Sequence, residues 1–109
     1  MNIPYLSLQQ VNRPHLEEME RAVADVMASG WFLKGEATRL FETDYAQYIG
    51  TRHCVACGNG LDALTLIFRA YKEMGAMQEG DEVIVQANTH IASLLSMTEN
   101  QLPPVVVEP

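Results

Sequence analysis

One short stretch, Cys54–Leu66, constrains the fold of this chain more than any other. Its first residues continue an apolar run, His53–Cys57, that is short enough for a buried strand. A Gly-Asn-Gly turn follows at residues 58–60, and a helical pattern of apolar residues begins directly at Leu61. The sequence therefore predicts a strand, a tight turn and a helix in immediate succession.

Such a junction leaves the first backbone N–H groups of the helix without partners and directs them, with the positive end of the helix dipole, toward the space beyond the strand. A phosphate group commonly occupies that position. Gly58 and Gly60 lack a Cβ atom, so the backbone could take a positive φ and approach an anion closely there. The turn is thus the first candidate binding site.

Two helices are expected before this junction. Apolar residues recur at helical spacing from Pro14 to Ser29, and Gly30 is a suitable terminator. A second helix is expected over residues 37–49, again followed by a glycine. The segment Asn2–Val11 shows no sustained period and is expected to be an extended arm.

After the junction, helical and strand patterns alternate. Two runs rich in β-branched residues are typical of strands buried on both faces of a sheet. The chain is therefore expected to be α/β with a mainly parallel sheet, two helices followed by β-α-β-α-β. The elements expected here are a helix to about Met74 ended by Gly75, a strand at Val83–Val85, a helix from His90 to Glu99 capped by Asn88 or Thr89, and a strand at Val105–Val107.

Composition narrows the class of protein. Of 109 residues, 48% are hydrophobic, and 7 basic against 14 acidic residues give a formal charge of -7. The basic residues are scattered, so no nucleic-acid partner is expected, and short apolar runs predict neither a membrane span nor a signal peptide. A soluble cytoplasmic protein is expected. Its strands need neighbours and cover, so we expect one incomplete domain: an arm and helices over 1–50, and the first part of an α/β domain over 51–109.

Cys54 and Cys57 have the C-x-x-C spacing of redox and zinc sites. Residues three apart on a strand point to opposite faces, and no second cysteine pair exists. We interpret them as small apolar strand residues and expect no metal site or disulfide.

Several segments together resemble one family, the DegT/DnrJ/EryC1/StrS sugar aminotransferases of the pyridoxal-phosphate fold type I group. The resemblance covers essentially the whole chain but only about the first quarter to third of a family member. The matching segments, similar in order and spacing, are residues 3–8, 29–36, 41–42, 58–64, 80–85 and 87–92.

The resemblance implies that the turn at 58–62 binds the phosphate of pyridoxal 5'-phosphate. The backbone N–H groups of Leu61 and Asp62, with Gly60 beside them, would hold it. The Asp62 carboxylate would repel a dianion, so it is expected to turn away and serve the first helical turn. Asn59 could donate to the phosphate or simply tolerate a left-handed turn conformation.

Three further residues match the family's substrate and cofactor positions. His90 stands where the family places an aromatic ring that stacks on the pyridine face, and an imidazole keeps such a face. Trp31 and Gly35 resemble the loop that borders the sugar site near the dimer interface, although a packing role for the tryptophan is equally consistent with the sequence.

The family's Schiff-base lysine is absent from this chain, because Lys34 and Lys72 match neither its position nor its motif. By resemblance, the parent enzyme moves an amino group from an amino acid, L-glutamate, to a ketone of a nucleotide-linked deoxysugar such as a dTDP-3-keto-6-deoxyhexose, and is a homodimer. The 109-residue chain alone is expected to be inactive.

Two other functions are compatible with the residues. The glycine turn also satisfies the G-x-G-x-x-G/A fingerprint of dinucleotide-binding proteins, but the next strand ends in Gln86-Ala87-Asn88 and lacks the acidic residue that binds the ribose. Alternatively, the chain could be a non-catalytic fragment that only pairs through its N-terminal helices.

Overall fold

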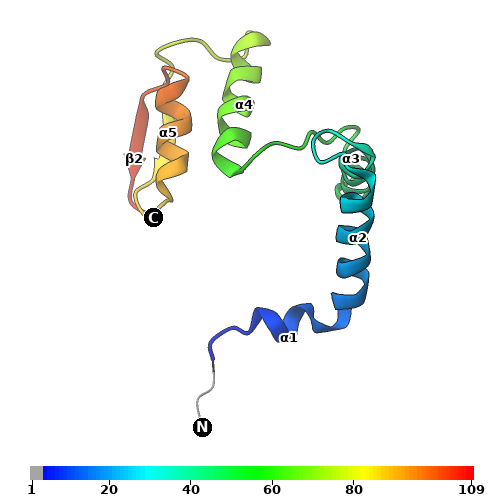
Figure 1. Cartoon of the computed structure of the whole chain (residues 1–109). Coiled ribbons are helices and arrows are strands. Elements are labelled where there is room, and N and C mark those ends of the chain that lie inside the picture. The colour runs from blue at the N-terminus through cyan, green and yellow to red at the C-terminus, as the bar shows by residue number, and fades with distance from the viewer. Residues whose placement is uncertain (1–3) are drawn as a thin grey trace. The chain divides into compact units, whose positions relative to one another are not determined.

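The computed structural model describes residues 4–109. The chain forms two compact units (Figure 1), which we call the helical unit, Met1–Val55, and the α/β unit, Ala56–Pro109. The expected division of one domain at residues 50 and 51 stays a prediction. No helix among the described residues combines the length and apolarity needed to cross a membrane.

The helical unit contains α1 (Leu8–Asn12), a 3₁₀ turn η1 (Arg13–His15), α2 (Leu16–Ser29) and α3 (Glu36–Ile49). Both long helices were expected, and both end as expected at glycines in the left-handed region, Gly30 with φ 66° and Gly50 with φ 82°. The sequence predicted helix from Pro14, but Pro14 lies in the 3₁₀ turn and the α-helix proper begins at Leu16.

The expectation of an extended arm is wrong in its second half. Residues Leu8–Asn12 form α1, because the Ser7 hydroxyl accepts a hydrogen bond from the Gln10 amide and so caps the helix. The first part of the predicted arm, Asn2 and Ile3, lies outside the described residues.

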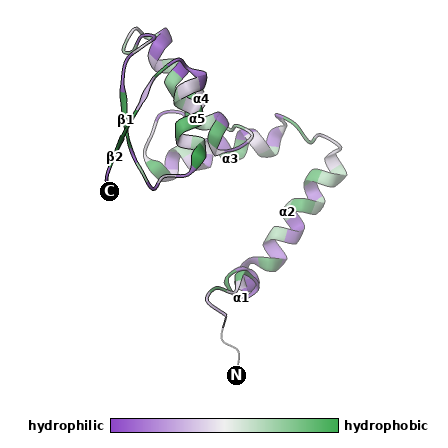
Figure 2. Ribbon diagram, turned by 90° about the vertical axis from the view of Figure 1, so that its left-hand side faces the viewer, coloured by the Kyte–Doolittle hydropathy of each residue, from purple (hydrophilic) through white to green (hydrophobic). Residues whose placement is uncertain are grey.

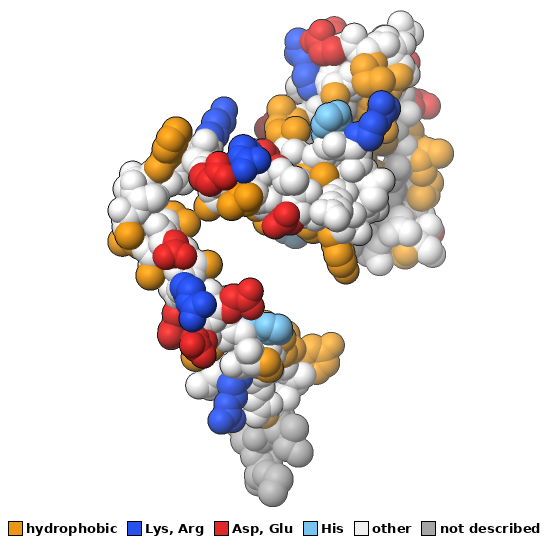
Figure 3. All heavy atoms as spheres, turned by 90° about the vertical axis from the view of Figure 1, so that its right-hand side faces the viewer, with side chains coloured by type: hydrophobic (Ala, Val, Ile, Leu, Met, Phe, Trp, Pro, Cys, Tyr) orange, Lys and Arg blue, Asp and Glu red, His pale blue; other side chains and the backbone are white. Residues whose placement is uncertain are grey.

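Apolar side chains on the helices of this unit remain exposed. Hydrophilic and hydrophobic colours alternate along α2 in Figure 2, as expected of an amphipathic helix, yet no residue of α2 is buried. Met19, Val23 and Met27 are 47%, 63% and 65% exposed, and orange side chains reach the surface throughout the face shown in Figure 3. The helical unit by itself therefore does not cover the apolar face of α2.

The α/β unit runs α4 (Gly60–Glu73), β1 (Val83–Gln86), α5 (Ile91–Glu99) and β2 (Pro104–Val107). The two strands pair in parallel, with Val83 opposite Pro104 and Gln86 opposite Val107, which confirms the α/β class. A small core joins these elements; its buried members are Val85, Met97 and Leu102, with Phe68, Met77, Val83 and Leu94 packed around them.

The parallel connection fixes the direction of the helices. Because α5 leads from the end of β1 back to the start of β2, its N-terminus lies at the carboxyl edge of the sheet. In Figure 1, α4 lies beside α5 and runs the same way, and the two helices are in contact. The N-termini of α4 and α5 therefore open toward the same end of the unit.

Two expectations about the sheet are wrong. Residues His53–Cys57 form no strand, because a strand requires a hydrogen-bonded neighbour and no described segment pairs with them. The strands are also not buried on both faces: Ile84 and Val106 are 73% and 55% exposed, since the helix that contacts both strands covers only one face. The observed order is thus helices followed by α4-β1-α5-β2.

Candidate functional site

The N-terminus of α4 has two backbone N–H groups without a partner. Asn59 is the N-cap, and its Oδ1 accepts a hydrogen bond from the Asp62 amide at 3.0 Å, while the Ala63 amide donates to the Asn59 carbonyl at 3.1 Å. Within residues 4–109, no hydrogen-bond acceptor contacts the amide of Gly60 or Leu61. These two N–H groups remain available to an anion, with the helix dipole behind them.

The capping pattern differs in detail from the expectation. The Asp62 amide, expected to face a phosphate, is engaged by Asn59 in this structure. Asn59 itself has extended backbone angles, φ -165° and ψ 178°, so the left-handed interpretation of this residue is wrong. Its side chain shapes the turn because an Asn oxygen satisfies one of the orphan donors of a helix N-terminus.

The Asp62 carboxylate makes a hydrogen bond within the first turn of α4, as expected. Its Oδ2 accepts a hydrogen bond from Asn59 Nδ2 at 3.0 Å, so the two side chains are joined reciprocally. A Cβ atom added to Gly58 would lie 2.7 Å from the same Oδ2, whereas one added to Gly60 would meet nothing within 4 Å. Neither glycine has a positive φ. Gly58 therefore makes room for the carboxylate, and Gly60 leaves open space in front of the free amides.

His90 is the N-cap of α5. Its Nδ1 accepts a hydrogen bond from the Ala92 amide at 3.2 Å, and the Thr89 and Ser93 hydroxyls lie 2.9 Å apart beside it. The expected caps, Asn88 and Thr89, are wrong, since the imidazole nitrogen performs this function one residue later. Because Nδ1 accepts, the neutral ring carries its proton on Nε2. The ring is exposed at the end of the unit where α4 also begins.

Trp31 and Gly35 belong to the helical unit and are packed together. The Trp31 Nε1 donates to the Leu33 carbonyl at 2.8 Å, and the tryptophan borders a groove of about 400 Å³ between α2 and α3. The side chains that line the groove are Ala22, Asp25, Val26, Ser29, Trp31, Glu36, Ala37 and Leu40. The assignment of Trp31 and Gly35 to the sugar site stays a prediction.

Gly35→Ala should destabilise the helical unit. The added Cβ would lie 3.1 Å from the Trp31 carbonyl oxygen and 3.2 Å from its ring atom Cγ, and Gly35 is buried. Overpacking of this kind costs about 1–2 kcal/mol. Chemical denaturation followed by the fluorescence of Trp31, the single tryptophan of the chain, measures the loss. Gly60→Ala, with open space around its Cβ, is the matched control; equal stabilities of the two variants would contradict the packing argument.

The first turn of α3 carries an ion pair between Glu36 and Arg39. Arg39 donates to both oxygens of Glu36, and this hydrogen bonding holds the pKa of the Glu36 carboxyl below its usual value, with the charge of Arg39 adding to the effect. The same contact raises the pKa of Arg39. A lowered carboxyl pKa contributes stability at neutral pH that is lost as the pH falls through it. The pair is fully exposed, so it supports the helix start rather than a reactive site.

The structure groups the predicted cofactor residues in one unit. Asn59, Gly60, Leu61 and Asp62 form the start of α4, and His90 begins α5 at the same end. The described residues contain no cluster of His, Cys, Asp and Glu with the geometry of a metal site, and Cys54 and Cys57 are both free thiols. The arrangement can bind an anion at the α4 amides and present an imidazole nearby.

Comparisons with known proteins point to one family. A model of the DegT/DnrJ/EryC1/StrS aminotransferase family matches residues 15–109. A dTDP-3-amino-3,6-dideoxy-alpha-D-galactopyranose transaminase from Aneurinibacillus thermoaerophilus is 47% identical over 107 residues, which cover 98% of this chain and 28% of that protein. The chain thus spans less than a third of the length of this relative.

Two solved structures share the fold. The crystal structure of S. venezuelae DesV is 38% identical with a TM-score of 0.82, covering 98% of this chain and 28% of that one. An E. coli GDP-4-keto-6-deoxy-D-mannose-3-dehydratase with bound hydrated PLP is 26% identical with a TM-score of 0.74, covering 81% and 23%. Both confirm the expected α/β architecture.

Proposed function

We propose a function from one premise: the chain belongs to the DegT/DnrJ/EryC1/StrS aminotransferase family. The whole protein transfers an amino group from an amino acid, L-glutamate, to a ketone of a nucleotide-linked deoxysugar, a dTDP-3-keto-6-deoxyhexose. Its cofactor is pyridoxal 5'-phosphate. The residues present here form part of the cofactor site, and they do not complete a transamination alone.

The observation that carries this proposal is the pair of unpartnered amides at Gly60 and Leu61. Two N–H groups at a helix start, with no Cβ in front of them, fit the oxygens of a phosphate ester. Asn59 fixes the turn by taking the Asp62 amide, so the two remaining donors are held in place before any ligand arrives. The residues present therefore fit the phosphate group of the proposed cofactor.

His90 would orient the aromatic ring of the cofactor. Its hydrogen bond from the Ala92 amide restrains the imidazole, and a restrained ring presents one flat face to a neighbouring aromatic group. When bound, the cofactor supplies the electron sink through which an amino group passes from donor to acceptor. The residues of this chain would bind the phosphate of the cofactor and orient its aromatic ring.

The one lysine of the α/β unit is already engaged. Lys72 Nζ donates to the Asn100 carbonyl at 2.9 Å and pairs with Glu79. This supports the proposal that the family's Schiff-base lysine is supplied by another part of the whole protein. The exposed apolar face of α2 likewise supports a homodimer of the whole protein.

Asp62→Asn should bind phosphate more tightly than the original chain. The substitution removes a negative charge beside the free amides while keeping an oxygen that can accept from Asn59. Two charges some 6 Å apart in water interact by about 0.7 kcal/mol, so the affinity for inorganic phosphate should rise about threefold at low salt. Titrations at low and high ionic strength measure this change. The gain should vanish at high salt, and a loss of affinity at low salt would contradict the assignment of the site.

The enzymatic proposal is tested in a chimera. Residues 1–109 replace the matching segment of the Aneurinibacillus transaminase, and the product is assayed by mass spectrometry with L-glutamate and a dTDP-3-keto-6-deoxyhexose. We expect formation of the amino sugar. A folded chimera that binds the cofactor yet forms no amine, or that dehydrates the sugar instead, would contradict the proposed reaction; binding of NAD in place of the cofactor would favour the dinucleotide alternative.

A further inference from the structure

A group of polar contacts joins α5 to α4 at the far end of α5. The Asn100 carboxamide donates to two carbonyl oxygens, that of Thr65 on α4 at 3.1 Å and that of Ser96 on α5 at 2.8 Å. The Thr65 hydroxyl donates to Glu99 Oε2 at 2.9 Å, and Lys72 Nζ donates to the Asn100 carbonyl at 2.9 Å. We call these five residues, Thr65, Lys72, Ser96, Glu99 and Asn100, the polar clasp.

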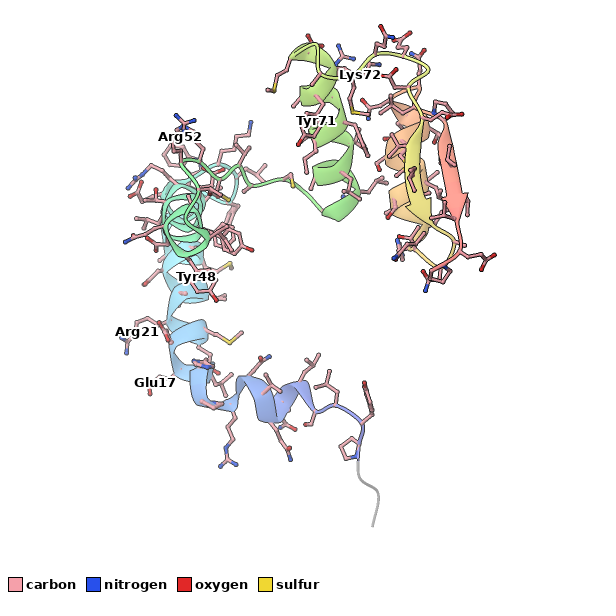
Figure 4. All side chains as sticks on the ribbon, turned by 180° about the vertical axis from the view of Figure 1, so that it is seen from behind. Glu17, Arg21, Tyr48, Arg52, Tyr71 and Lys72 are labelled. Atoms are coloured by element: carbon pink, nitrogen blue, oxygen red, sulfur yellow. The ribbon has the colours of Figure 1, made fainter. Side chains whose placement is uncertain are left out.

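The clasp is buried at its centre. Asn100 is 5% exposed and Ser96 is fully buried, and no buried side-chain nitrogen or oxygen among the described residues lacks a partner. In Figure 4, Lys72 extends from α4 toward the side on which α5 and the strands lie. A satisfied buried network specifies one arrangement, because sliding of α5 along α4 would break the three hydrogen bonds that cross between the helices: Asn100 to Thr65, Thr65 to Glu99 and Lys72 to Asn100.

The clasp therefore fixes the position of α5 along α4. Asn100 Nδ2 contacts the carbonyl oxygens of Thr65 and Ser96, and each of these residues lies five residues after the first residue of its helix, Gly60 or Ile91. Because the two carbonyls are held together on helices that run the same way, the starts of α4 and α5 are brought to similar levels. His90, the N-cap of α5, is thus placed near the level of the free amides.

This arrangement suits the proposed ligand. A phosphate ester held in front of Gly60 and Leu61 would bring its aromatic ring toward the end of the unit at which His90 is exposed. We propose that Asn100 is a positioning residue of the cofactor site: by locking α5 to α4, it sets the distance between the phosphate-binding amides and the imidazole. The inference rests on the proposed function, because it concerns the same site.

The test compares two ligands on one protein. Inorganic phosphate needs only the amides of α4, while pyridoxamine 5'-phosphate, which has no aldehyde to react with lysines, needs the amides and His90 together. Asn100→Asp keeps the shape of the side chain but replaces its donor with an oxygen facing two carbonyls. Thr98→Ala is the matched control, since its hydroxyl donates to the Leu95 carbonyl within α5 and takes no part in the polar clasp. Amide and imidazole NMR signals report both affinities.

In Asn100→Asp, the affinity for pyridoxamine 5'-phosphate should fall about three- to tenfold, the contribution of one aromatic stack, while that for inorganic phosphate stays within twofold. The ligand-induced shift of the His90 ring signals should disappear, and Thr98→Ala should change neither affinity. Equal losses for both ligands, or no loss for either, in a folded Asn100→Asp chain would overturn the positioning role.

Should Asn100→Asp unfold, Lys72→Met decides the question. It keeps the aliphatic stem but loses the bond to the Asn100 carbonyl, and it should shift the ratio of the two affinities about twofold in the same direction. An unchanged ratio would overturn the inference. Failure of the original chain to bind either ligand would instead contradict the proposed function, so the two failures are distinguishable.

Discussion

Gly60→Pro should bind pyridoxamine 5'-phosphate about 10- to 100-fold more weakly than the original chain, because one charge-assisted hydrogen bond is worth about 1.5–3 kcal/mol. The substitution deletes a single backbone N–H. Gly60 is the first residue of α4, the position at which proline is best tolerated in a helix, and the preceding Asn59 already has the extended backbone that proline requires. The helix should therefore remain while one phosphate donor is lost.

Gly60→Ala is the control that separates the amide from the glycine. It keeps the N–H, so its affinity should fall less than that of the proline variant, although its Cβ would occupy part of the space that Gly60 leaves open. Equilibrium dialysis of the three chains gives the affinities, and circular dichroism verifies that α4 is retained. Equal affinities for the proline and alanine variants would show that the Gly60 amide does not hold the phosphate.

Leu102→Ala should lower the free energy of unfolding of the α/β unit by about 2–5 kcal/mol. Leu102 is 1% exposed and is the most buried apolar side chain described, packed with Val85 and Met97 between α5 and the strands. So small a core has few other contacts to compensate for the cavity. A loss of this size is comparable with the whole stability of a unit this small.

Urea titration followed by far-ultraviolet circular dichroism measures this loss. Leu95→Ala is the matched control, since the same atoms are removed from a side chain of α5 that is 42% exposed, and it should cost less than about 1 kcal/mol. Similar midpoints for the two variants would show that Leu102 is not the centre of the core.

The sequence predicted those elements whose causes are local. The apolar period of α2 and the left-handed glycines Gly30 and Gly50 act within a few residues of each other, and the structure confirms them. The strand expected at His53–Cys57 failed for a non-local reason, because pairing needs a partner strand that no described segment provides. The prediction that both faces of the sheet are buried was wrong for the same reason, since burial of the second face requires other elements to pack against it.

The candidate site was predictable only in outline. The glycine turn and the position of His90 were identified from sequence, but the choice of caps was not. Asn59, Asn88 and Thr89 are all residue types that can cap a helix. Only the structure shows that Asn59 is the N-cap of α4 and that His90 is the N-cap of α5. The sequence did not indicate a positioning role for Asn100, because a polar residue after a helix usually marks only the end of that helix. The role proposed for Asn100 depends on its contact with Thr65, 35 positions earlier.

A titration of the ¹⁵N-labelled chain with pyridoxamine 5'-phosphate tests the cofactor site most directly. The largest shifts should occur at the amides of Gly60 and Leu61 and at the ring of His90, and inorganic phosphate should compete at the two amides but not at the imidazole. Shifts that avoid residues 60 and 61, or that leave His90 unchanged while the ligand binds, would contradict the assignment.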